Sequence, residues 1–121
     1  MKGRRESSER QGDPPVEPFS AALERQRLTL LRDRTTTLQV NVGLLCNQVC
    51  RHCHLDAGPG RREIMARETM EEVVAYAGRG GFSCVDVTGG APEMLPGLDH
   101  LLRGLAGHTS RLMLRSNLTA I

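Results

Sequence analysis

The chain has 121 residues, of which 39% are apolar and 25% are charged, so it is long enough for one small globular domain and too short for two. Its 16 basic and 14 acidic residues leave a formal net charge of +2, which argues against a nucleic-acid-binding protein. With two Phe, one Tyr and no Trp, any core must be built from aliphatic side chains.

The N-terminal residues and the cysteine content indicate a cellular compartment. No stretch of the sequence reaches the about 18 consecutive apolar residues that a membrane helix requires, and residues 1–10 are charged with no hydrophobic segment after them. We therefore expect a cytoplasmic protein that contacts no membrane. In the reducing cytosol, the four cysteines are predicted to bind metal or act in catalysis rather than form disulfides.

The first part of the chain is predicted to be poorly ordered. Residues 1–18 combine charges, Ser, Gly and three of the six prolines with almost nothing apolar, which predicts a disordered N-terminal tail. Residues 19–121 are predicted to form the folded part. Its first element is a short helix between Phe19 and Leu31, with Ser20 as the N-cap.

Strands and helices are predicted to alternate through the rest of the chain. Residues 35–42 alternate apolar and polar side chains with a period of two, and residues 83–88 and 111–117 read as two further strands. Two segments with apolar residues at helical spacing, Arg67–Ala77 and Leu98–Leu105, separate these strands, and glycines follow each of them.

This order predicts an α/β fold with three parallel strands and two crossover helices, joined right-handedly. The chain stops at Ile121, just beyond the third predicted strand, and a three-stranded sheet has open edges. We therefore expect a truncated chain whose complete form has further strands.

Three of the four cysteines lie together in a loop directly after the first predicted strand. Cys46, Cys50 and Cys53 have the spacing C-x3-C-x2-C within eight residues. Closely spaced thiolates of this kind hold iron-sulfur clusters, and a cluster with three protein ligands leaves one iron open. The alternative is a small structural zinc-binding interaction module, in which Cys50, Cys53 and nearby histidines hold the metal.

Other polar residues near this loop have more ordinary interpretations. Cys84 lies within a predicted strand beside valines, so we expect a small core residue and not a ligand. His54 and Asp56 either orient ligands or cap the turn before Gly58 and Pro59.

Two longer motifs resemble a known family. The run LQVNVGLLCNQVCRHCHLDAGP, from Leu38 to Pro59, is followed by TGGAPE after the second predicted strand and by RSNLT at the end of the third. The cysteine spacing and the glycine pair resemble the radical S-adenosylmethionine (SAM) superfamily, and the longer string resembles the arsenosugar biosynthesis radical SAM proteins. The resemblance covers about residues 20–121 and implies the N-terminal part of a partial (β/α)6 barrel.

The resemblance implies that Cys46, Cys50 and Cys53 ligate three irons of a 4Fe-4S cluster whose fourth iron binds SAM. A reduced cluster passes one electron to the sulfonium of SAM, which releases methionine and a 5′-deoxyadenosyl radical. In the resembled family the radical acts on a methylated arsenical, and a flavodoxin or ferredoxin is the expected electron donor. We expect the isolated 121-residue chain to bind the cluster poorly and to be inactive.

The resemblance also implies contacts to SAM. Gly89 and Gly90 match the superfamily's glycine-rich motif and would let the backbone approach the methionyl part of SAM. Asn117 ends the third strand on the same rim as a candidate SAM contact, although Asn is also a common turn residue. This sequence departs from the superfamily's pattern at two positions: His52 stands where an aromatic residue usually precedes the third cysteine, and Ala91 stands where the glycine-rich motif usually has Glu, with Glu93 two residues later.

Overall fold

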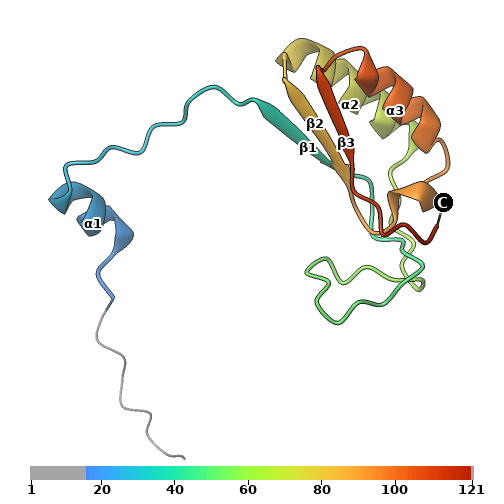
Figure 1. Ribbon diagram of the computed structural model, residues 1–121, viewed down its shortest axis with the longest axis horizontal. Coiled ribbons are helices and arrows are strands. Elements are labelled where there is room, and N and C mark those ends of the chain that lie inside the picture. Colours follow the sequence, from blue (N-terminus) through green and yellow to red (C-terminus); the bar gives the residue numbers. More distant parts are fainter. Residues whose placement is uncertain (1–15, 121) are drawn as a thin grey trace, which may run out of the picture. The chain divides into compact units, whose positions relative to one another are not determined.

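The computed structural model describes residues 16–120, and the chain divides into two units between Asp33 and Arg34. The first unit contributes helix α1 (Phe19–Arg25), and the second contains a three-stranded sheet with the remaining helices (Figure 1). Most of the tail predicted over residues 1–18 lies outside the described residues. In the described part of the chain, no helix is long and apolar enough to cross a membrane.

Helix α1 is shorter than predicted and begins differently. It starts at Phe19 directly after Pro18, and no side chain caps its N-terminus, so the prediction of Ser20 as the N-cap is wrong. The helix ends at Arg25, and Arg27 then adopts a left-handed φ of 52°, which a helix cannot continue. None of the α1 residues is buried, so packing does not extend the helix toward Leu31 as the apolar pattern predicts.

The second unit confirms the predicted parallel sheet. The three strands lie in chain order with parallel neighbours: β1 (Thr37–Asn41), β2 (Cys84–Thr88) and β3 (Arg111–Leu114). Asn41 pairs with Thr88, and Val87 pairs with Leu114. The carboxyl ends of all three strands therefore meet at one edge of the sheet.

Strand β3 is shorter than the predicted strand over residues 111–117. It ends at Leu114, although the backbone N–H of Arg115 still donates to β2. Beyond it, the hydroxyl of Ser116 accepts a hydrogen bond from the backbone N–H of Leu118 at 2.8 Å. This local side-chain bond makes a turn that competes with a strand, and it places Asn117 in the turn and not in the sheet.

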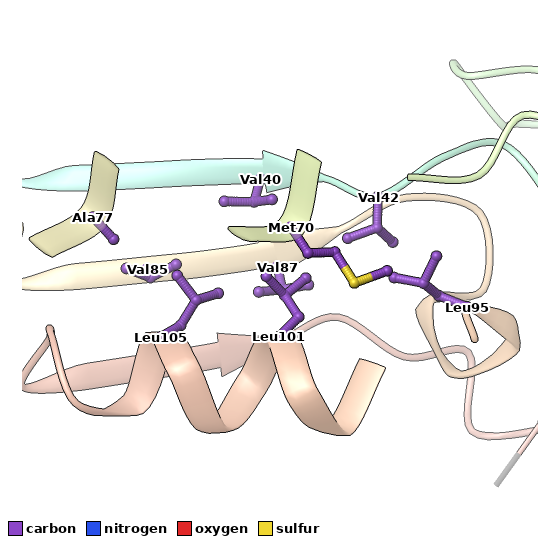
Figure 2. Close-up of a cluster of buried hydrophobic side chains, with 9 residues drawn as sticks. All are labelled: Val40, Val42, Met70, Ala77, Val85, Val87, Leu95, Leu101 and Leu105. Atoms are coloured by element: carbon purple, nitrogen blue, oxygen red, sulfur yellow. The ribbon is translucent and has the colours of Figure 1, made fainter. Parts of the chain in front are cut away.

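Helices α2 (Arg67–Gly80) and α3 (Leu98–Ala106) cover one face of the sheet. Helix α2 continues three residues beyond the predicted end at Ala77 and stops at the predicted glycine pair, where Gly81 takes a left-handed φ of 61°. Figure 2 shows the buried aliphatic core between the sheet and these helices. Its members are Val40, Val42, Met70, Ala77, Val85, Val87, Leu95, Leu101 and Leu105.

The sheet has a second, more polar face. Val85 and Val87 point into the helix-covered core, so Asp86 and Thr88 point to the opposite face. Cys84 shares that opposite face and is half-buried outside the core cluster, so the prediction of a core residue is wrong. It also begins β2, at the end of the strand away from the cysteine loop.

Candidate functional site

A cavity of about 220 Å³ lies at the carboxyl edge of the sheet. Its walls come from the cysteine loop after β1, from the end of β2 and from the turn after β3. The structure brings all of the predicted site residues to this cavity: Cys46, Cys50, Cys53, Gly89, Gly90 and Asn117.

Backbone hydrogen bonds close the base of the cysteine loop. The N–H of Cys46 donates to the carbonyl of Gly58 at 3.2 Å, and the N–H of Gly58 donates to the carbonyl of Leu44 at 3.1 Å. Leu45 and Gly58 form a parallel bridge at the same place. The two ends of the loop are thereby fixed to each other, which holds the cysteines beside the sheet edge.

The glycine pair after β2 packs against this loop base. The N–H of Gly90 donates to the carbonyl of Gly43 at 2.9 Å, and the N–H of Ala91 donates to the carbonyl of Leu45 at 2.8 Å. A Cβ on Gly90 would lie 2.2 Å from the Leu45 carbonyl oxygen, and Gly89 has a φ of 150°. The chain itself therefore requires glycine here, while the predicted approach to SAM stays a prediction.

The three cysteine sulfurs have different surroundings. Cys46 is buried, and its sulfur accepts a hydrogen bond from the backbone N–H of Gln48 at 3.5 Å and from the side-chain amide of Asn117 at 3.7 Å. Cys53 is half-buried, whereas Cys50 is exposed. The Asn117 side chain thus connects the turn after β3 to the cysteine loop.

The three thiols at the cavity are the candidate donors for a metal site. Within residues 16–120, no three His, Cys, Asp or Glu side chains converge on a point that would hold a single metal ion. A structural zinc ion needs four donors around one centre, and the zinc alternative built on Cys50, Cys53 and nearby histidines stays a prediction. A 4Fe-4S cluster takes each thiolate on a separate iron, and three thiols around one cavity fit that donor set.

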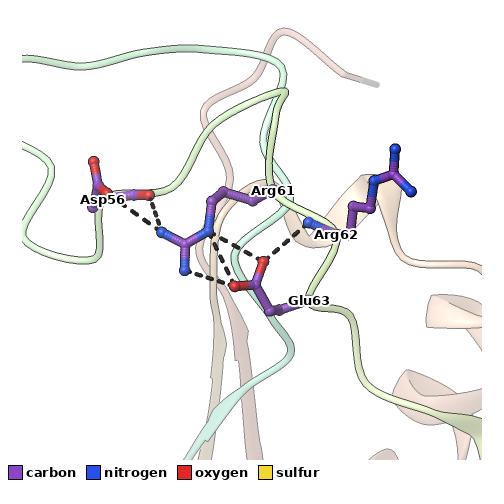
Figure 3. Close-up of polar contacts among 4 residues, drawn as sticks. All are labelled: Asp56, Arg61, Arg62 and Glu63. Carbon is purple, nitrogen blue, oxygen red and sulfur yellow. Dashed lines mark hydrogen bonds and ion pairs between the residues drawn. The ribbon is translucent and has the colours of Figure 1, made fainter.

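A charged cluster braces the far side of the cysteine loop (Figure 3). The guanidinium of Arg61 donates to the backbone carbonyl of Asp56 at 2.9 Å and to the carboxylate of Glu63 at 2.8 Å. Asp56 has a positive φ of 51° and a fully exposed carboxylate, which supports its predicted role in a turn and not as a ligand. His54, in contrast, lines the cavity.

The hydrogen bonds of this charged cluster lower the pKa of Glu63. Hydrogen bonds from the Arg61 side chain, and then from backbone N–H groups including that of Arg62, lower the pKa of Glu63 from 4.5 to about 2. A carboxyl whose folded-state pKa is lowered stabilises the fold above its unfolded-state pKa, and this contribution disappears as the pH falls toward the folded-state pKa.

Replacing Arg61 with alanine is therefore expected to reduce stability in a pH-dependent manner. Above about pH 5, the free energy of unfolding of the variant should be lower than that of wild type by a constant amount. This difference should shrink as the pH falls from about 4.5 to about 2, because Glu63 then becomes protonated in both proteins. Urea unfolding across this pH range measures it. Arg62→Ala is the control, since the Arg62 side chain points away from Glu63 (Figure 3). A loss that does not vary with pH would contradict the assignment.

Several residues of the cavity wall did not emerge from sequence reasoning. The wall also includes Gln48, Leu55, Ala57 and Thr88, and only their positions between or shortly after the cysteines, or beside the glycine pair, signalled them. Glu93 lies outside the wall, in the short 3-10 helix η1 (Pro92–Met94), with both carboxylate oxygens buried and without a hydrogen-bond partner among the described residues.

Comparisons with known proteins give partial matches. No family model matches the chain. It is 29% identical over 86 residues to a probable GTP 3′,8-cyclase of Pyrococcus horikoshii, covering 71% of this chain and 28% of that protein, and 28% identical over the same length to that of Pyrococcus abyssi. A probable GTP 3′,8-cyclase of Saccharolobus islandicus is 29% identical over 90 residues, which is 74% of this chain and 25% of that protein.

The chain therefore spans about a quarter of the length of the curated relatives it matches. These relatives are named as probable GTP 3′,8-cyclases and do not support the arsenosugar family that the longer string resembles. Similarity to GTP 3′,8-cyclases, which are radical SAM enzymes, supports the radical SAM superfamily for this chain.

Proposed function

We propose that the protein is a radical SAM enzyme whose cysteine loop holds a 4Fe-4S cluster. The observation that carries the proposal is the cavity at the carboxyl edge of a parallel sheet, where three thiols of one loop face a glycine pair. Ligands in parallel α/β folds gather at this edge. The partial similarity to radical SAM enzymes supports the same conclusion.

In this proposal Cys46, Cys50 and Cys53 hold the cluster, and the cavity beside them receives SAM. The cluster and SAM would supply one-electron reductive chemistry when bound. Asn117 donates to a cysteine sulfur and so orients it, which is the kind of contact that tunes an iron-sulfur site. The apolar side chains of Ala57 and Ala91 pack beside Cys46 and keep water from that side of the site.

The substrate in this proposal is a small molecule. The string from Leu38 to Pro59 favours a methylated arsenical, whereas the relatives, named as probable GTP 3′,8-cyclases, favour GTP as the second candidate. A cytoplasmic location and a flavodoxin or ferredoxin as electron donor belong to the same proposal.

Cluster loading tests the proposal directly. The protein is expressed from its complete reading frame and reconstituted with iron and sulfide without air. We expect a brown protein with broad visible absorbance that bleaches on dithionite. Cys46→Ala should lose most of this absorbance, because it removes a ligand that is already buried and hydrogen-bonded at the site.

Cys84→Ala is the matched control, because Cys84 lies at the opposite end of β2 from the cavity, and this variant should keep the absorbance. A colourless, zinc-loaded protein that unfolds with a chelator would contradict the proposal and support the zinc module. With a loaded protein, separate incubations with SAM, dithionite and either a methylated arsenical or GTP identify the substrate by mass spectrometry of the products.

A further inference from the structure

A buried carboxylate lies on the face of the sheet that α2 and α3 do not cover. Asp86 is only 3% exposed, although it points away from the aliphatic core that its neighbours Val85 and Val87 join. A buried charge is costly unless it is paired, so its partners on this face matter.

Arg115 is the main partner of Asp86. Its Nε donates to one carboxylate oxygen at 2.9 Å, and its Nη2 donates to the other at 2.6 Å. The side-chain amide of Gln39 donates to the same carboxylate at 3.3 Å. Hydrogen bonds from Arg115, with a smaller contribution from Gln39, hold the pKa of Asp86 below its usual range.

The guanidinium of Arg115 is only partly used by this pair. Its side chain is 61% exposed, and its Nη1 has no hydrogen-bond partner among the described residues. Asp86 holds the planar guanidinium of Arg115 in one orientation. A ligand that binds the free edge of this guanidinium therefore does not have to offset the entropy of ordering the side chain. A rigid guanidinium with a free edge is suited to bidentate hydrogen bonds with an oxyanion.

The pair also lies next to the cavity. Asp86 comes two residues before Thr88 on the same face of β2, which corresponds to about 7 Å along a strand. Thr88 lines the cavity, and so does Asn117, two residues after Arg115. The free edge of Arg115 is therefore on the open face of the sheet, beside the site that would hold the cluster and SAM.

We propose that Arg115, oriented by Asp86, binds a phosphate-type oxyanion of the substrate. This inference rests on the proposed function, and it goes further by giving the substrate a negative charge. Of the two candidate substrates, it favours a phosphorylated nucleotide over a methylated trivalent arsenical, which has no phosphate group.

The test uses inorganic pyrophosphate as the probe and isothermal titration calorimetry on the cluster-loaded protein from its complete reading frame. Removing Arg115 alone would leave Asp86 buried and unpaired, which destabilises a fold, so the variant is Asp86→Asn combined with Arg115→Gln. We expect this double variant to retain the cluster absorbance and to bind pyrophosphate at least about tenfold more weakly, a difference of about 1.4 kcal/mol. Arg111→Gln is the control, because Arg111 is exposed on the same face at the other end of β3.

Each outcome decides the inference. Wild-type protein that does not bind pyrophosphate, or a double variant that binds it as tightly as wild type, would overturn the inference. If Arg111→Gln weakens pyrophosphate binding as much as the double variant does, the binding reflects only general charge attraction. If the double variant loses the cluster absorbance, the pair of Asp86 and Arg115 is structural. Either result overturns the inference. Wild-type protein without a cluster spectrum would instead overturn the proposed function.

Discussion

Alanine in place of Gly90 is expected to prevent cluster loading and to destabilise the fold by about 3 kcal/mol. The added Cβ would lie 2.2 Å from the carbonyl oxygen of Leu45, 2.7 Å from its carbonyl carbon and 3.0 Å from that of Leu44. All of these are backbone atoms, so no side-chain rotation relieves the contact. Cys46 directly follows Leu45 in the chain. A backbone movement that relieves the contact at Leu45 would therefore displace the first of the proposed cluster ligands.

Gly60→Ala provides the matched control for this substitution. Gly60 lies in the segment that closes the same loop, and an added Cβ there meets no heavy atom within 4 Å. Its stability should change by no more than about 0.5 kcal/mol, and its cluster absorbance should match that of wild type. Urea unfolding and anaerobic reconstitution measure the two effects. If Gly90→Ala behaves like Gly60→Ala, packing against the loop base does not explain the glycine.

The strands and helices of the second unit were predictable because burial imposes a strong pattern on them. Val40, Val85 and Val87 alternate with polar residues, since one face of each strand packs on helices and the other does not. The apolar positions of α2 and α3 recur at helical spacing for the same reason, and Gly81 marks a position that needs a left-handed backbone. Where one face is buried, the type and order of the elements agree between sequence and structure.

The elements that were predicted incorrectly lack this constraint. Helix α1 buries none of its residues, so its apolar pattern does not determine its length. Strand β3 ends early because the turn built by Ser116 forms a local hydrogen bond that no periodic pattern reveals. Cys84 was assigned to the core by its valine neighbours, yet the period of two puts it on the other face.

The site was predictable in part for a related reason. Three closely spaced cysteines are easily recognised in a sequence as candidate metal ligands. Gly90 and Asn117 follow neighbouring parallel strands, so they were expected at the same edge of the sheet, and they line the same cavity as the cysteines. The pair of Asp86 and Arg115 is different, because these residues are 29 positions apart and meet only through the register of β2 and β3. The packing reason for Gly90 was hidden in the same way, since its contact at Leu45 is with backbone.

The substrate is harder to predict than the cofactor site. In the proposed function, the cysteine spacing serves the cluster and the glycine pair packs on the loop base, so neither depends on which molecule is the substrate. Side chains that face the substrate, such as the proposed Arg115, decide selectivity and follow no common spacing. This explains why the motifs resemble one family while the partial matches are to GTP 3′,8-cyclases.

Truncating Leu101 to alanine is expected to lower the free energy of unfolding by about 2–5 kcal/mol, because it removes a fully buried side chain from a well-packed core. Leu101 is 0% exposed and belongs to the core cluster that also contains Val87 and Met70 (Figure 2). Helix α3 also connects the segment after Gly90 to β3. If Leu101→Ala weakens the packing of α3, the variant should also bind less of the cluster, because Gly90, before α3, and Asn117, after β3, both line the cavity.

Arg103→Ala is the control for this prediction, because Arg103 is exposed on the same helix and Ala and Arg have similar helix propensities. Its stability should stay within about 0.5 kcal/mol of wild type in urea unfolding. A cost below about 1 kcal/mol for Leu101→Ala would mean that the cavity collapses freely or that α3 does not pack as described. Equal losses in both variants would point to helix formation, and not to core packing, as the source of the effect.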